Sequence, residues 1–260
     1  MTSTLLVGGT GLVGSYILST LISHPSISSI HALSRRDPQT PSSKLHPLTS
    51  TDTDTWPSLL TTLTPPPSLF FSSLGTTRAQ AGSIEAQRKI DHDLNLALAT
   101  RVAQSRAPPQ TKKIYILIST SGANPTSMIP YSRMKGELEE AVKALALGGN
   151  ESSSSSTEEG TESNTGFNHV IILRPGLIVG TRSDSRPPEF VMRKVAGWAG
   201  WLNPGLKDFW AQDAEVIGRA AVNAGLRALE GKDGESEVPR VWELGMADIV
   251  RLGRTEWKEE

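Results

Sequence analysis

Residues 4–14 read TLLVGGTGLVG, and this stretch decides the fold. Its first four residues favour a β-strand, its glycines form a G-x-G-x-x-G turn, and apolar residues then recur at helical spacing. Such a turn brings backbone amides and the positive end of a helix up to a pyrophosphate. The stretch therefore predicts a dinucleotide site, with a tight turn of no chemical role as the alternative. The predicted contact residues are Gly8, Gly9, Thr10, Gly11, Leu12, Val13 and Gly14.

The rest of the chain alternates between strand and helix patterns. Strands are predicted at 28–34, 69–72, 114–118, 170–173 and 241–244, and helices at 56–63, 90–102 and 134–145. Residues 37–67 are rich in Pro, Ser and Thr and hold only the first of these helices. This order predicts an α/β fold, namely a Rossmann-like doubly wound parallel sheet with a small C-terminal lobe.

The 260 residues are expected to form one dinucleotide-binding domain. Residues 148–168 form an insert that includes a run of five serines and has little to bury, which predicts a disordered surface loop. Residues 183–240 form the predicted substrate-side lobe, and most of the tryptophans lie in or beyond it.

Composition and charge exclude several classes of protein. A net charge of −1 gives no basic surplus for nucleic-acid phosphates. The absence of cysteine excludes disulfides and thiolate zinc sites, and the five histidines show no metal-ligand spacing, so no metal is expected. The apolar runs are too short for a membrane-spanning helix, and the first residues do not resemble a secretory signal.

The end of the second predicted strand indicates which dinucleotide binds. NAD enzymes usually place an acid about 20 residues after the glycines. Here Ser34 stands near that position and is followed by Arg35 and Arg36. Guanidinium groups suit the 2′-phosphate of NADP, so these three residues are predicted contacts and NADP is favoured over NAD. Asp37 keeps NAD open, and two solvated loop arginines without a ligand are the alternative.

Tyr131 and Lys135 stand four residues apart on a predicted helix, so both can point into one cleft. An ammonium nearby can lower the pKa of a phenol from about 10 towards about 7, and the phenol can then pass a proton to a carbonyl oxygen. The preceding strand ends in the hydroxyl residues Ser119 to Ser121, at the edge where open α/β sheets bind ligands. Helix caps and turns are the alternative use of these hydroxyls. With the glycine turn, the pattern predicts an oxidoreductase site.

On these motifs the chain resembles the short-chain dehydrogenase/reductase superfamily, in its atypical branch. Further stretches are similar to the fungal mitochondrial outer-membrane reductase-like proteins, which are related to the animal Tat-interacting oxidoreductase-like group. They are SSLGTTR at 72–78, KIDHDLN at 89–95, ISTSGAN at 118–124 and LRPG at 173–176. The resemblance covers nearly the whole chain apart from the insert.

The resemblance implies Tyr131 as the acid/base and Lys135 as the residue that lowers its pKa and binds the nicotinamide ribose. It also implies that Thr120, or else Ser121, orients the substrate. Many superfamily members carry an asparagine where Asp91 stands, which puts a proton-relay role of that residue in doubt. The cofactor contacts implied beyond the glycine turn are Leu74, Gly75, Thr76, Pro175 and Gly176.

Two functions follow from different classes of protein. The first is an NADP-dependent oxidoreductase that transfers hydride to or from a carbonyl or alcohol substrate. The second is an NADP(H)-binding regulatory or scaffold protein whose cofactor occupancy gates a protein partner, with little turnover. The Tyr131/Lys135 pair favours the enzyme, because a sensor needs no proton donor. The substrate, the reaction direction and the oligomeric state have no signal in the sequence.

The resemblance also implies peripheral association with the mitochondrial outer membrane, with a cytoplasmic location as the alternative. The stretch 190–202 combines Phe, Val, Trp and Leu with Arg193 and Lys194, which is consistent with an interfacial helix or with aromatics packed inside a substrate lobe. Cleavage of a presequence would remove the first strand, so we expect targeting to leave the chain intact.

Overall fold

The computed structural model describes residues 2–38, 40–108, 110–147, 166–180 and 211–258. In this part of the chain the centre of the molecule is a seven-stranded sheet in which each neighbouring pair is parallel. Its order is β11 (Val241–Leu244), β6 (His169–Leu173), β5 (Ile114–Ile118), β4 (Leu69–Ser72), β1 (Thr2–Val7), β2 (Ile27–Ser34) and β3 (Leu45–Thr49). The predicted Rossmann-like parallel sheet is confirmed.

The central strands are apolar on both sides because helices cover both faces of the sheet. In β5, Ile116 points to one face and Tyr115 and Leu117 point to the other. In β1, Leu6 and Leu5 divide in the same way. Continuous apolar runs therefore mark the centre of the sheet, as the sequence predicts for 114–118.

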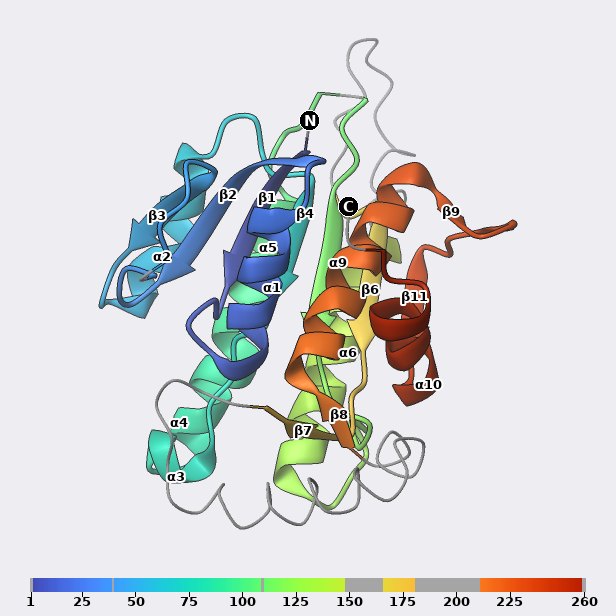
Figure 1. Cartoon of the computed structure of the whole chain (residues 1–260). Helices are drawn as coiled ribbons and strands as arrows, with labels where there is room; N and C mark the ends of the chain where they lie inside the picture. Colours follow the sequence, from blue (N-terminus) through green and yellow to red (C-terminus); the bar gives the residue numbers. More distant parts are fainter. Residues whose placement is uncertain (1, 39, 109, 148–165, 181–210, 259–260) are drawn as a thin grey trace, which may run out of the picture.

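Two layers of helices enclose the sheet (Figure 1). One face packs against α1 (Leu12–Ser23), α9 (Ala214–Glu230) and α10 (Met246–Val250), which the π-helical turn η5 (Arg251–Thr255) extends. The other face packs against α2 (Trp56–Leu59), α5 (Asn95–Ala103) and α6 (Pro130–Leu147). The first layer lies in front of the sheet in Figure 1 and the second behind it.

Shorter elements complete the described part of the chain. Two helices and a π-helical turn lead into α5: α3 (Arg78–Ala81), α4 (Ile84–Arg88) and η3 (Lys89–Leu94). Single 3₁₀ turns flank α2 at η1 (Thr53–Thr55) and η2 (Leu60–Thr62). Two small ladders pair β7 (Leu177–Val179) with β8 (Ala211–Asp213), and β9 (Lys232–Asp233) with β10 (Ser236–Glu237).

Strand β3 is a correction to the sequence analysis, which predicts no strand within 37–67. It forms the edge of the sheet beside β2, and three of its five residues are exposed. Pro47 lies within it, and proline is tolerated at an edge because one side of the strand needs no hydrogen-bond donor. The strand therefore lacks the apolar run that identifies its neighbours.

Most of the insert and about half of the lobe lie outside the described residues. Residues 148–165 and 183–210 are not described, and the predicted interfacial stretch 190–202 falls among them. Phe167, which the sequence analysis places in the insert, is buried and stacks on Tyr115 with 5.3 Å between ring centroids. Of the predicted lobe, α9 packs against β5, β6 and α1.

Candidate active site

The glycine turn joins β1 to α1 in a shape that favours glycine at two positions. Gly8 has a φ of 80°, in the left-handed region. A Cβ at Gly14 would lie 2.1 Å from the carbonyl oxygen of Gly8, so the first turn of α1 lies directly against the glycine turn. The helix starts without a side-chain cap and without an acid in its first turn. Its amides are therefore available to an anion.

The other residues predicted in this turn differ in what they expose. Thr10 is exposed and Gly11 partly so, and the Gly11 amide donates to the carbonyl of Gly8 at 2.8 Å. Leu12 is partly buried, whereas Gly9 and Val13 are buried. A ligand at this turn would therefore contact the backbone of the loop rather than the side chains of Leu12 and Val13.

Ser34 and the two arginines lie at the end of β2, which is the neighbour of β1 in the sheet. The buried Ser34 hydroxyl donates to the carbonyl of Arg36 at 2.5 Å, which fixes the turn. Arg35 and Arg36 are exposed, and neither forms an ion pair within the described part of the chain. The structure therefore places two available cations beside the strand that carries the glycine turn.

The segment after β4 passes close to the glycine turn. A Cβ on Gly8 would lie 2.7 Å from the carbonyl carbon of Ser73, whose hydroxyl donates to the carbonyl of Val7 at 3.1 Å. Leu74 is partly buried against the core, and Gly75 is exposed. The Thr76 amide donates to Asp91 at 2.6 Å. The structure thus brings Ser73 and Leu74 next to the glycine turn, and the contact of 74–76 with a cofactor stays a prediction.

Tyr131 and Lys135 occupy the first turns of α6, after β5. Tyr131 is 40% exposed, whereas Lys135 is only 4% exposed. The Lys135 ammonium donates to the carbonyl of Ile118, the last residue of β5, at 3.1 Å. This contact anchors the helix carrying Tyr131 to the carboxyl end of the central strand.

Three hydroxyl residues follow β5, and the structure separates them into two roles. Ser119 is buried and donates to the carboxylate of Glu139. Thr120 is partly exposed and Ser121 is exposed, and no described residue is hydrogen-bonded to either hydroxyl. The two hydroxyls predicted to orient a substrate are therefore available, and the choice between them stays a prediction.

The charges around Tyr131 shift three pKa values. Partial burial raises the pKa of the Tyr131 phenol, and the negative charge of Asp91 raises it further. Burial lowers the pKa of Lys135, against the opposing effect of Asp91 and Glu139. Burial also raises the pKa of Asp91, which the Thr76 amide and Lys135 oppose. The phenol is consequently protonated near neutral pH, the state a proton donor needs, and the predicted lowering of its pKa by Lys135 remains a prediction.

A buried ion pair beneath the site is absent from the sequence predictions. Glu139 is 1% exposed and accepts from the guanidinium of Arg174 at 2.5 Å. Arg174, directly after β6, also donates to Glu243 at 2.6 Å. The signal for Glu139 was present, because it follows Lys135 by four residues and so shares its helix face.

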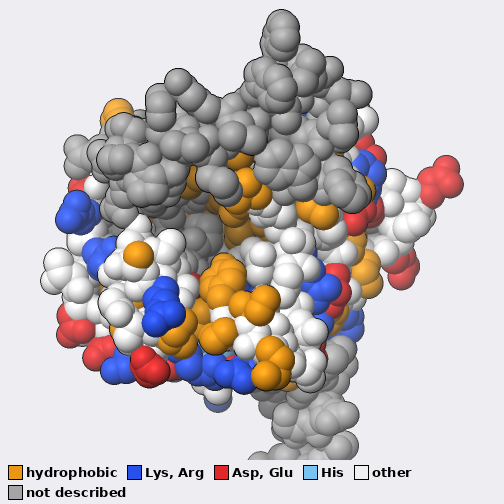
Figure 2. Space-filling view, turned by 90° about the horizontal axis from the view of Figure 1, so that it is seen from below, with side chains coloured by type: hydrophobic (Ala, Val, Ile, Leu, Met, Phe, Trp, Pro, Cys, Tyr) orange, Lys and Arg blue, Asp and Glu red, His pale blue; other side chains and the backbone are white. Residues whose placement is uncertain are grey.

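The segment after Arg174 joins the same edge. The Ser121 amide donates to the carbonyl of Pro175 at 2.8 Å, and the Gly176 amide donates to the buried Gln212 side chain at 2.7 Å. The candidate site residues therefore gather at the carboxyl ends of β1, β2, β4, β5 and β6. Figure 2 views the molecule from this end and shows hydrophobic side chains gathered between Lys and Arg side chains.

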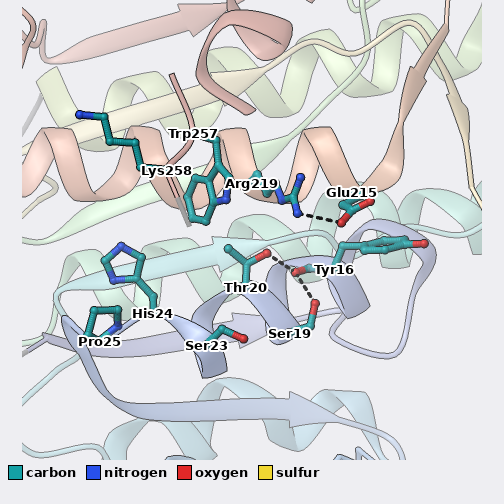
Figure 3. Close-up of a pocket in the computed structure, with 10 residues that line it drawn as sticks. All are labelled: Tyr16, Ser19, Thr20, Ser23, His24, Pro25, Glu215, Arg219, Trp257 and Lys258. Carbon is teal, nitrogen blue, oxygen red and sulfur yellow. Dashed lines mark hydrogen bonds and ion pairs between the residues drawn. The ribbon is translucent and has the colours of Figure 1, made fainter. Parts of the chain in front are cut away.

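A separate groove of about 420 Å³ lies between α1 and α9 (Figure 3). Its walls include Tyr16 and His24 on one side and Trp257 on the other, and Glu215 pairs with Arg219 at 3.0 Å within it. None of the candidate site residues lines this groove. We therefore assign it no part in the chemistry.

The described residues hold neither a candidate metal centre nor a candidate membrane-spanning helix. Among them, no three His, Asp or Glu side chains lie close enough to hold a metal ion. Within the same residues, no helix combines the length and the apolar character needed to cross a membrane.

The fold and the site define the class: a Rossmann-like protein with the fold of short-chain dehydrogenases/reductases. The solved structure of MoeE5 with UDP-glucuronic acid and NAD superposes with a TM-score of 0.61 at 14% identity, over 94% of this chain and 76% of that chain. A short chain dehydrogenase family protein from Francisella tularensis gives a TM-score of 0.61 at 11% identity, over 95% of this chain and 98% of that one. No family model matches the chain.

Curated relatives are much more similar in sequence. A protein of Aspergillus terreus named "Protein fmp52-1, mitochondrial" is 50% identical over 257 residues, which is 98% of this chain and 100% of the relative. "Protein fmp-52, mitochondrial" of Neurospora crassa is 43% identical over 265 residues, 99% of this chain and 98% of the relative. The chain belongs to the Fmp52 family. The resemblance to these fungal proteins is confirmed.

Proposed function

We propose that the protein is an NADP-dependent oxidoreductase that acts on a carbonyl or alcohol substrate, with Tyr131 as the acid/base. One observation carries the proposal: the Tyr131/Lys135 turn of α6 lies at the same sheet edge as the glycine turn and two available hydroxyls. When bound, the nicotinamide would supply the hydride in reduction and accept it in oxidation. The structural relatives solved with NAD support a dinucleotide of this kind.

The residues of this chain fit such a cofactor. A Cβ at position 14 would clash with the carbonyl of Gly8, so only glycine allows α1 to start this close to the glycine turn. The first amides of α1 carry no side-chain cap and suit a diphosphate. Leu74, Gly75 and Thr76 would line the cofactor on one side, and Pro175 and Gly176 on the other. Arg35 and Arg36 would bind a 2′-phosphate, and Ser34 would support their loop. Lys135 would bind the ribose hydroxyls.

Each group near the substrate has one task. The protonated Tyr131 phenol donates to a carbonyl oxygen in reduction, and its phenolate accepts the proton in oxidation. The hydroxyl of Thr120, or else Ser121, donates to the same oxygen and orients it. The Lys135 ammonium favours the phenolate, because opposite charges attract.

The test is NADPH binding by fluorescence, followed by NADPH consumption against a panel of aldehydes and ketones. Tyr131→Phe is expected to leave cofactor affinity within about threefold and to lower turnover by about a hundredfold or more, the usual contribution of a general acid. Turnover unaffected by this substitution would overturn the assigned mechanism. Absence of binding to both nucleotides would overturn the oxidoreductase proposal.

The choice of NADP has its own test. Arg35→Ala is expected to weaken NADPH about tenfold or more, while NADH binding changes little, because NADH lacks the phosphate that an arginine binds. Asp37→Ala is the converse substitution in the same loop: it removes no cation, and weaker NADH binding in this variant with NADPH binding retained would instead indicate that Asp37 binds the ribose of NAD. Equal losses for both nucleotides in Arg35→Ala would contradict the 2′-phosphate contact.

One observation favours the second function, a nucleotide-gated regulatory or scaffold protein. Partial burial and Asp91 raise the pKa of Tyr131, which opposes formation of the phenolate. Tight NADPH binding without turnover on a broad panel, together with a partner protein that binds only one cofactor state, would establish this function instead.

We further propose that the protein is mitochondrial and associates peripherally with the outer membrane. The names of the Aspergillus and Neurospora relatives support the mitochondrial part. Cell fractionation followed by alkaline carbonate extraction and protease treatment of intact mitochondria tests both parts. Recovery in the cytosol alone would contradict them.

A further inference from the structure

Asp91 is a buried carboxyl to which the proposed chemistry gives no task. It lies in η3, between α4 and α5, and is 2% exposed. π-Helical turns within longer helices are frequent at functional sites. Buried carboxyls persist only when their oxygens are bonded, so the partners of Asp91 indicate what it does.

Both oxygens of Asp91 accept from groups that fix the segment after β4. The Thr76 amide donates to Oδ1 at 2.6 Å. The side-chain amide of Gln87 donates to Oδ2 at 3.3 Å and to the carbonyl of Thr76 at 2.9 Å. A Cβ on Gly75 would lie 3.8 Å from Oδ1, which is ordinary contact. Asp91 and Gln87 therefore hold Thr76 by both its N–H and its C=O.

The charge of Asp91 acts on two residues of α6: it favours the ammonium of Lys135 and the neutral phenol of Tyr131. Glu139 acts on Lys135 as a second carboxylate. On the helix of Asp91 itself, Asp93 has a 56% exposed side chain and bonds His92 at 2.8 Å. Of these two aspartates, only Asp91 is turned into the site.

We propose that Asp91 is a positioning residue, which fixes segment 74–76 on the cofactor side through Thr76 and supplies the negative charge that acts on Lys135 and Tyr131 on the other side. The inference rests on the proposed function, which assigns cofactor binding to segment 74–76 and acid/base chemistry to Tyr131 and Lys135. Asp91 acts through Thr76 and Lys135 and transfers no proton itself. The Asp91 carboxylate has two effects: it accepts the Thr76 amide, which orders segment 74–76, and its charge raises the pKa of the Tyr131 phenol. A neutral amide at this position would keep only the first effect.

The hydrogen-bonding part is tested without any cofactor. In Asp91→Ala the Thr76 amide is expected to exchange with deuterium at least about tenfold faster, since a buried bond to a charged acceptor is lost. Asp93→Ala removes an aspartate from the same helix and is expected to leave that exchange rate unchanged. Equal exchange in wild type and Asp91→Ala would overturn this part.

The electrostatic part is tested with Asp91→Asn, which keeps the shape and an oxygen for Thr76 if the alanine variant fails to fold. The titration midpoint of Tyr131, followed by NMR of ring-labelled tyrosine and assigned with Tyr131→Phe, is expected to fall, because the negative charge that raises the pKa of the phenol is removed. Asp93→Asn is the matched control and is expected to shift it by less than about 0.3 unit, because solvent screens an exposed charge. A midpoint that does not fall in Asp91→Asn would overturn the electrostatic part.

Cofactor experiments separate this inference from the proposed function. Asp91→Ala is expected to weaken NADPH binding about tenfold, and in Asp91→Asn the pH–rate profile should move down with the Tyr131 midpoint. If wild type binds no nucleotide, the proposed function fails, while amide exchange and titration still decide the structural claim. If wild type turns over but neither readout moves, Asp91 is not a positioning residue.

Discussion

Two buried lysines lie at opposite ends of strand β5, and they differ in their partners. Lys113, directly before the strand, is 0% exposed and donates to the carbonyls of Ala103 at 2.6 Å and Ser105 at 2.9 Å. Lys135 is 4% exposed, donates to the carbonyl of Ile118 at the other end, and interacts with two carboxylates. Burial lowers the pKa of both ammonium groups, that of Lys113 to about 8.

The comparison teaches that burial of a lysine does not by itself mark a functional site. Lys113 binds carbonyls at the end of α5, where a cation is favoured by the helix dipole and satisfies groups that lack helical partners. Lys135 also donates to a carbonyl, but the negative charges of Asp91 and Glu139 act on its ammonium, and it lies beside available hydroxyls and a phenol. The surroundings, rather than the buried charge, separate a structural lysine from one placed for chemistry.

The largest expected difference between the two lysines is in turnover. Lys135→Met is expected to lower kcat/KM on the substrate found in the panel by about a thousandfold, since the phenol loses the cation that favours its phenolate. Lys113→Met is expected to stay within about threefold of wild type, because it lies at the far end of β5. Both rates are measured well below the unfolding temperature of each variant.

Similar losses in both variants would contradict the division between structural and chemical lysines. Circular dichroism and NADPH binding of Lys113→Met show whether the fold is intact when its rate is measured. Full activity in Lys135→Met would remove that residue from the mechanism.

A second prediction makes Lys135 more like Lys113 by removing one of its carboxylates. Glu139→Gln is expected to lower the free energy of unfolding by about 3 kcal/mol, because breaking a buried ion pair leaves charges without compensation. Arg174 keeps its bond to Glu243, which limits the loss. Glu243→Gln is the matched control, and its 37% exposed side chain predicts a loss of under about 1 kcal/mol. Urea unfolding compares the two, and equal losses would show that Glu139 contributes no more than a surface pair.

The sequence was sufficient for the central part of the fold and not for its edge. Strand β5 is found at the residues predicted, because a five-residue apolar run between breakers has few other structures. Strand β3 was missed, since an edge strand with exposed residues and Pro47 has no such run. Burial of Phe167 was missed because the serine-rich composition around it dominates the pattern.

For the candidate site, the residues that carry a motif could be found and those that support them could not. Tyr131 and Lys135 show their relation through helical spacing. The bonds of Asp91 to Thr76 and of Glu139 to Arg174 join segments 15 and 35 residues apart, and only the packed sheet brings them together. Lys113 gave no signal, because its partners are backbone carbonyls, which every residue has.

The smallest predicted effect is the pH dependence of stability at Lys113. Its folded pKa of about 8 lies below the ordinary lysine value of 10.5, so between these pH values the unfolded chain binds more protons. Stability contributed by this group is therefore expected to rise by about 2.5 kcal/mol from pH 8 to pH 10.5. The rise stays below the roughly 3 kcal/mol that the whole shift allows, because the folded group is already half deprotonated at pH 8 and the unfolded group only half deprotonated at pH 10.5.

Lys113→Met should remove this rise, since methionine fills the space without a proton to lose. Lys112→Met is the matched control: Lys112 is only partly buried and donates to the carbonyl of Leu229 at 2.8 Å, so its variant should keep the wild-type rise. Urea midpoints measured across the range give the difference between the two variants, in which the titration of all other groups cancels. Parallel curves for both variants would mean that Lys113 titrates as an ordinary lysine. Lys113 and Lys135 would then share their burial, but burial would not have lowered the pKa of Lys113.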